Sequence, residues 1–92
     1  MLNMRADEGF YRKSCTSIDG GLTWSSPQIS IDQIDCKCQG SILSIGGAVF
    51  LSKAASATER INMTIKKSTD NGKNWKGQYT VYEGNSGYSD IV

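Results

Sequence analysis

Several common signals are scarce or missing in this chain. Its 92 residues include no histidine, one proline and three cysteines, and the formal net charge is +1. A charge so close to zero gives no electrostatic reason to expect binding to nucleic acid or to an anionic membrane. The longest apolar run is only Ala48 to Leu51, so we expect no membrane-spanning segment. The first residues also lack the basic start and apolar stretch of a signal peptide.

The cysteines give little support for a metal site or a disulfide framework. An odd number of cysteines argues against a disulfide-stapled fold. Cys36 and Cys38 form a Cys-x-Cys pair, but a structural zinc site needs about four ligands and no histidine is available. We therefore expect no metal, and we interpret these residues as small, half-buried thiols beside a turn.

What the chain does contain is an internal repeat. The segment 17–24 reads SIDGGLTW and the segment 68–75 reads STDNGKNW, so Ser, Asp, Gly and Trp recur at the same spacing 51 residues later. A period near 50 residues is the length of one four-stranded blade of a β-propeller. The repeat therefore predicts two successive copies of one supersecondary unit.

Strand-like patterns flank both copies. FYRKSCTS and INMTIKKS lead into the motifs, while TWSSPQISI and WKGQYTVYE follow them. GSILSI and AVFLS flank a Gly-Gly pair that predicts a hairpin, and KAASATER between two strands is interpreted as a loop. No stretch has a convincing helical period. The sequence thus predicts an all-β chain forming a single domain over residues 1–92, without an internal boundary.

The predicted blades divide unevenly along the chain. Residues 40–83 supply one whole blade, and the residues before them supply most of an earlier one. The segment YSDIV then takes the place that GSILS holds one period earlier, so we expect it to begin a further blade. The chain should therefore hold about one complete blade and parts of two neighbours.

The repeated motif suits a tight turn between strands. Aspartate can accept hydrogen bonds from backbone amides two or three residues later, glycine adopts positive φ without steric cost, and serine can join the start of the turn to its end. Tryptophan can cover the hairpin and retain an indole N–H to donate. The predicted structural residues are Ser17, Asp19, Gly21 and Trp24 in the first copy and Ser68, Asp70, Gly72 and Trp75 in the second. Identical turns on successive blades stand apart, so the two aspartates are not interpreted as a catalytic pair.

These motifs resemble the Asp boxes of sialidases (neuraminidases), although propellers with other activities or with none also carry such boxes. The likeness extends over nearly the whole chain in the family's order: the segments are LNMRADEGFYRKSCTSIDGG, CQGSIL, ATERINMTIKKSTDNGKNW and GYSDIV. The resemblance implies a partial six-bladed β-propeller, namely the C-terminal part of a sialidase catalytic domain. It also implies a secreted or periplasmic location, which the composition leaves undecided.

The resemblance implies three site residues. Arg5 and Arg60 match two members of the arginine triad that binds the sialic acid carboxylate, and a guanidinium can bind a carboxylate with two parallel hydrogen bonds. Tyr88 matches the nucleophile, and sialidases are an exception among retaining glycosidases in using tyrosine. A neutral phenol avoids the repulsion that a carboxylate nucleophile would meet at a carbon already bearing a carboxylate.

Other arginines and tyrosines are assigned no role in the site. Arg12 lies in the strand that leads into the first Asp box and is expected to be solvated. Aromatic packing inside the blades is expected for Tyr11, Tyr79 and Tyr82.

The implied activity is exo-hydrolysis of terminal α-linked sialic acids from glycoproteins, glycolipids and oligosaccharides, by a retaining mechanism and without a cofactor. The family's first arginine, acidic Asp and base Glu find no match here, and Glu8, Glu59 and Glu83 lie in unrelated contexts. We therefore expect the isolated chain to be inactive and marginal in stability or prone to aggregate, because an open ring leaves strand edges bare.

Three alternatives remain open. A non-catalytic Asp-box propeller that binds glycan or protein would have no need of Arg5, Arg60 and Tyr88 together. A different glycosidase would need paired carboxylates, and none is visible. A trans-sialidase would share all three residues with a hydrolase.

Overall fold

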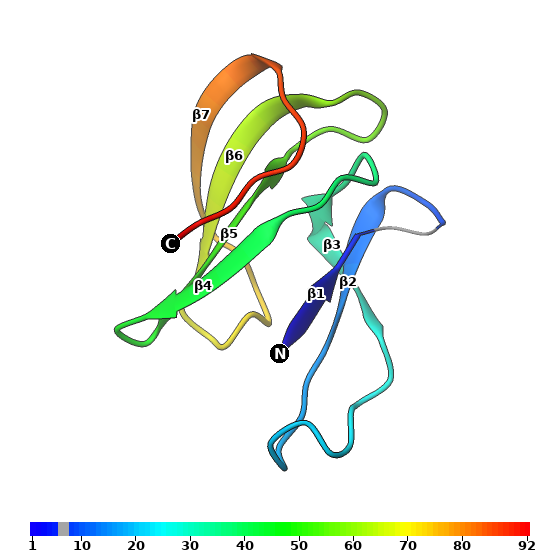
Figure 1. The fold of residues 1–92 in the computed structure, drawn as a ribbon, viewed down its shortest axis with the longest axis vertical. Coiled ribbons are helices and arrows are strands. Elements are labelled where there is room, and N and C mark those ends of the chain that lie inside the picture. The colour runs from blue at the N-terminus through cyan, green and yellow to red at the C-terminus, as the bar shows by residue number, and fades with distance from the viewer. Residues whose placement is uncertain (6–7) are drawn as a thin grey trace.

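The computed structural model of the chain describes residues 1–5 and 8–92 (Figure 1). The fold is all-β, as predicted, and consists of two antiparallel sheets. No helix occurs within the described residues, and therefore none there is long and apolar enough to cross a membrane.

The first sheet has three strands in the order β1-β2-β3. Their bounds are Leu2–Met4, Tyr11–Cys15 and Gln28–Ile34. The β2–β3 register shifts between Tyr11 and Lys13, so the partner of Tyr11 is Ile34 but that of Lys13 is Ile29. The first Asp-box motif forms most of the connection between β2 and β3.

The second sheet is a four-stranded meander in the order β4-β5-β6-β7. Its strands are Ser41–Ile45, Ala48–Ala54, Ile61–Ser68 and Gly77–Asn85. Gly46 and Gly47 join β4 to β5 with φ values of 57° and 82°, which is the left-handed geometry of a tight hairpin turn. This sheet matches the whole predicted blade, with β5 extending two residues beyond the predicted AVFLS.

The predicted strand at the C-terminal end is wrong for this structure. Ser86–Val92 contains no strand and runs back across the second sheet toward β4 (Figure 1). A strand needs a neighbour to satisfy its amides and carbonyls, and here serine side chains supply part of that bonding instead. The Ser89 hydroxyl bonds to Ser52 in β5, and the Ser41 hydroxyl accepts the amide of Ile91 at 3.0 Å.

The buried interior is unusually polar. The apolar members include Leu51, Ala54 and Trp75, but fully or nearly fully buried polar side chains are more numerous: Arg12, Gln33, Asp35, Ser52, Lys53, Thr64 and Ser68. Two of the polar contacts join the sheets, because Lys53 and Lys66 of the second sheet donate to the carbonyls of Ile34 and Asp32 in β3.

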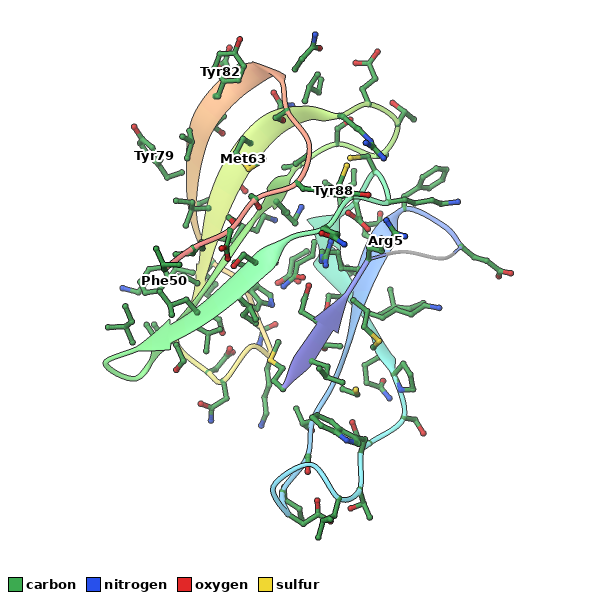
Figure 2. The ribbon with its side chains drawn as sticks, in the orientation of Figure 1. Arg5, Phe50, Met63, Tyr79, Tyr82 and Tyr88 are labelled. Carbon is green, nitrogen blue, oxygen red and sulfur yellow. The ribbon has the colours of Figure 1, made fainter. Side chains whose placement is uncertain are left out.

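Four predictions about side-chain burial are wrong. Arg12 is only 3% exposed, because its guanidinium forms an ion pair with Asp35 inside this polar interior. Tyr11, Tyr79 and Tyr82 are exposed rather than packed in a core. For the last two the reason is visible in Figure 2: they lie along β7, the outer strand of its sheet, on the side away from β1–β3.

Candidate functional site

The two Asp-box motifs form the same turn. The Ser17 hydroxyl donates to Asp19 Oδ1 at 2.7 Å and accepts the Gly21 amide at 2.9 Å, while Asp19 Oδ1 accepts the Thr23 amide at 2.9 Å. The second turn has the same three contacts. The Ser68 hydroxyl donates to Asp70 Oδ1 at 2.7 Å and accepts the Gly72 amide at 2.9 Å, and Asp70 Oδ1 accepts the Asn74 amide at 2.9 Å. The amide bound by each aspartate lies four residues later, one further along than the predicted span. The motif is therefore a hydrogen-bonded turn, as expected, and its carboxylates are occupied within the turn.

Arg5, Arg60 and Tyr88 lie together, although they are separated widely in sequence; we call them the Arg–Tyr cluster. Arg5 Nη1 lies 3.4 Å from the Tyr88 hydroxyl oxygen. The Arg60 guanidinium carbon lies 5.5 Å from the centroid of the Tyr88 ring, within the range of a cation–π contact. Figure 2 shows Arg5 and Tyr88 close to each other, far from Tyr79 and Tyr82.

Each member of the cluster comes from a different part of the fold. Arg5 directly follows β1, and its Nη1 also donates to the Lys37 carbonyl at 3.4 Å. Arg60 directly precedes β6, and its carbonyl accepts the Ser86 amide at 2.7 Å. That backbone bond draws the C-terminal segment against the β5–β6 loop and brings Tyr88 beside Arg60.

Two further contacts hold the segment that carries Tyr88. The Ser52 and Ser89 hydroxyls lie 2.7 Å apart, and the Ser41 hydroxyl donates to Asp90 at 3.1 Å. Tyr88 is thus flanked on its C-terminal side by anchored residues, while its own side chain remains 56% exposed. Both arginines are also exposed, so a ligand in solvent can reach all three side chains.

Two open hollows border the cluster. One, of about 520 Å³, is lined by residues 39–41 and 88–90, and the other by residues 3–5 together with Arg12, Gln39 and Gly40. Gln39 and Gly40 line both, so the hollows adjoin each other at the start of β4. A separate cleft at the Asp-box end, lined by Cys15, Asp32, Asn71 and Lys73 among others, lacks the paired guanidinium groups of the cluster.

A network of buried polar side chains lies beside the Arg–Tyr cluster. Arg12 Nη1 contacts Asp35 Oδ1 at 3.3 Å and the Cys38 carbonyl at 2.9 Å, and Arg12 Nε donates to Asn3. Asn3 in turn donates to Gln33 Oε1 at 3.0 Å. Burial lowers the pKa of Arg12, and Asp35 partly offsets that effect. Because the network ties β1 to β2, β3 and the β3–β4 connection, it fixes the strand that Arg5 follows.

Lys53 is a second buried cation near this network. Burial lowers the pKa of Lys53 to about 8, and the neighbouring positive charge of Lys66 acts in the same direction. Neither Arg12 nor Lys53 was predictable as buried from its own strand pattern. The available signal is a long charged residue inside a β-strand together with an acidic residue just after the strand that pairs with it, as with Arg12 in β2 and Asp35 directly after β3.

Within residues 1–5 and 8–92, no three Cys, Asp or Glu side chains gather closely enough to hold a metal ion. Glu8, Glu59 and Glu83 are all exposed.

No protein-family model matches this chain, and a search of curated proteins finds no significant relative.

Proposed function

We propose that this chain is part of the catalytic β-propeller of an exo-α-sialidase. In this proposal Arg5 and Arg60 bind the carboxylate of a terminal sialic acid, and Tyr88 attacks the anomeric carbon. The observation that carries the proposal is the Arg–Tyr cluster: the residues that the resemblance assigns to one site lie within contact distance, although 83 positions separate Arg5 from Tyr88.

The chemistry of the cluster fits an anionic sugar. Two guanidinium groups offer planar donors for a carboxylate, and each charge-assisted hydrogen bond contributes on the order of 1.5–3 kcal/mol. The same positive charges stabilise the negative charge that develops on the phenol oxygen as Tyr88 loses its proton during attack. A ligand carboxylate would replace the Arg5–Tyr88 contact and leave the phenol oxygen directed at the adjacent carbon.

The fold is compatible with blades of a ring. The second sheet is a complete four-stranded meander, and the first sheet supplies three strands arranged in the same antiparallel way. Exposed apolar side chains lie on β3 and β7, each an edge strand of its own sheet: they are Tyr79, Val81, Tyr82, Ile29 and Ile31. Further blades on either side would bury these groups, and in this proposal they would also supply the acidic Asp, the base Glu and the remaining arginine.

The decisive experiment is covalent trapping of the nucleophile in a protein that contains this chain within its complete domain. A fluorinated sialosyl fluoride that forms a slowly hydrolysed glycosyl–enzyme should label Tyr88, and tryptic digestion places that residue in the peptide that begins at Gly77. Tyr88→Phe should abolish both the label and the hydrolysis of an α-sialoside. Tyr82→Phe is the matched control, since Tyr82 is 59% exposed and lies in the same peptide.

A label on another residue, or wild-type turnover in the Tyr88→Phe variant, would refute the proposal. Binding of sialosides without turnover in the complete domain would favour a non-catalytic glycan-binding propeller. Transfer of sialic acid to a galactoside acceptor in preference to water would identify a trans-sialidase using the same site.

Arg60→Lys tests the carboxylate clamp separately. Lysine retains the charge but loses the planar pair of donors, so we expect catalytic efficiency with α-sialosides to fall by about tenfold to a hundredfold. Lys73→Gln, which removes an exposed charge in the second Asp-box turn, should leave it unchanged. A loss of efficiency in Lys73→Gln with none in Arg60→Lys would instead indicate nonspecific electrostatics.

A further inference from the structure

The thiol groups of two cysteines contact each other in the connection between β3 and β4. Cys36 Sγ and Cys38 Sγ are 3.5 Å apart, and both thiols are free. Lys37 between them has a φ of 63°, a left-handed conformation that turns the backbone sharply. In an extended strand, residues two apart point to the same face but are separated by about 6.7 Å. The turn at Lys37 instead brings the two sulfurs to 3.5 Å.

We propose that Cys36 and Cys38 form a reversible disulfide, and that closing it changes the position of Arg5. A disulfide bond is about 2.05 Å long, so the two sulfurs must approach by roughly 1.5 Å. The third cysteine, Cys15, is buried in β2 and takes no part in the proposed bond.

The link to Arg5 passes through the backbone of the Cys36–Cys38 turn. The Lys37 carbonyl accepts Arg5 Nη1 at 3.4 Å, and the same nitrogen lies 3.4 Å from the Tyr88 hydroxyl. The Cys38 carbonyl accepts Arg12 Nη1 at 2.9 Å. Both carbonyls belong to the segment whose torsions must adjust when the ring closes. Because Arg12 is buried and tied to Asp35 while Arg5 is exposed, the adjustment should fall mainly on Arg5.

The bond can form by exchange with a small disulfide such as oxidised glutathione. The Cys36 thiolate attacks one glutathione sulfur and releases a first glutathione thiol, and the Cys38 thiolate then attacks Cys36 and releases a second. The protein loses two electrons and two protons, and the oxidant becomes two thiols. Burial, followed by the Cys38 contact, raises the pKa of Cys36 to about 11, so exchange should be slow near neutral pH.

The first test is mass spectrometry of the Cys15→Ala variant equilibrated with oxidised glutathione at mildly alkaline pH. The intact chain should lose the mass of two hydrogen atoms, and reduction should restore it. Trypsin cleaves after Lys37, and removal of Cys15 leaves one cysteine in each of the peptides 14–37 and 38–53. These two peptides should therefore appear as one linked species. The added Cys38→Ser substitution should instead trap a glutathione adduct on Cys36.

A chain that keeps its full mass, or that forms only dimers or glutathione adducts with Cys36 and Cys38 both present, would overturn the disulfide. The variant with Cys36→Ser and Cys38→Ser retains no pair of cysteines and is the negative control, which should keep its full mass.

The second test addresses Arg5 by NMR of the arginine Nε–H groups, with the Arg5 signal assigned through Arg5→Lys. Oxidation should shift the Arg5 signal clearly and the Arg60 signal little. Identical Arg5 signals in the two redox states would refute the coupling even if the disulfide forms. Neither readout uses a sialoside, so failure here is distinguishable from failure of the proposed enzymatic function. The inference rests on the proposed function only in treating Arg5 as part of a ligand-binding site.

Discussion

The two Asp-box turns have the same internal hydrogen bonds but different surroundings. Trp24 of the first turn is 43% exposed, and its indole donates to the Gly21 carbonyl at 3.1 Å. Trp75 of the second turn is 5% exposed, and its indole nitrogen finds no partner among the described residues. The polar geometry of this motif is therefore set locally by its own residues, whereas its burial is set by what packs against it.

What packs against the second turn is the first sheet. Asp32 of β3 accepts the Trp75 amide at 2.8 Å, and a side-chain carbon placed on Gly72 would lie only 2.5 Å from the sulfur of Met1. The second turn thus lies against the sheet that precedes its own. In a propeller the first turn would be covered by the blade before it, so the comparison of the two turns measures what such a neighbour contributes.

The largest difference between the turns should come from their tryptophans. Trp75→Ala removes a buried indole and is expected to lower the free energy of unfolding by about 3–5 kcal/mol, enough to unfold a chain of marginal stability. Trp24→Ala exposes less new surface and should cost less than about 2 kcal/mol. Urea unfolding followed by far-UV circular dichroism measures both. Equal losses would show that Trp75 is not held by the first sheet.

The serines should differ less. Ser68 is buried, so Ser68→Ala leaves the Gly72 amide without its acceptor in a dry site, at a cost of about 1–3 kcal/mol. Ser17 is partly exposed and water can replace its hydroxyl, so Ser17→Ala should cost about 0.5–1 kcal/mol. The same unfolding assay applies. A larger loss for Ser17→Ala would contradict the idea that surroundings, rather than the turn itself, set the difference.

The repeat and the strands were predictable because their signals are local. The Ser-x-Asp-x-Gly pattern specifies its own hydrogen bonds, and the Gly46–Gly47 pair specifies a hairpin within its own few residues. The burial of Arg12 was not predictable, because it depends on Asp35, directly after β3, and on the Cys38 carbonyl in the connection that follows. The return of Ser86–Val92 onto β4 depends on Ser41 and Ser52, about 37 to 50 residues earlier, which no local pattern encodes.

The candidate site, like the burial of Arg12, could not be predicted from local patterns. Arg5, Arg60 and Tyr88 could be chosen only by resemblance, since nothing in their local patterns marks them out. Their proximity follows from long-range contacts, such as the Ser86 amide on the Arg60 carbonyl, that depend on the whole arrangement of both sheets.

The smallest difference between the turns should be in their response to acid. Hydrogen bonds from the Thr23 hydroxyl, and next from its amide, lower the pKa of Asp19 from 3.8 to about 2. The Asn74 amide, with the Ser68 hydroxyl, likewise holds the pKa of Asp70 far below its usual range. A carboxyl whose pKa is lower in the folded state stabilises the fold above its unfolded pKa, and that stabilisation is lost as pH falls through the folded value.

Stability should therefore decline as pH falls from about 4 to about 2, with the contribution of Asp70 persisting to lower pH than that of Asp19. Asp19→Asn and Asp70→Asn should each lower stability at neutral pH and flatten the acid decline, by similar amounts, because each carboxylate accepts its hydrogen bonds mainly within its own turn. Asp90→Asn, outside both turns, is the control. The free energy of unfolding of the three variants should be measured across this pH range. A strong effect from one aspartate alone would mean that packing against the first sheet also changes the hydrogen bonds within the motif.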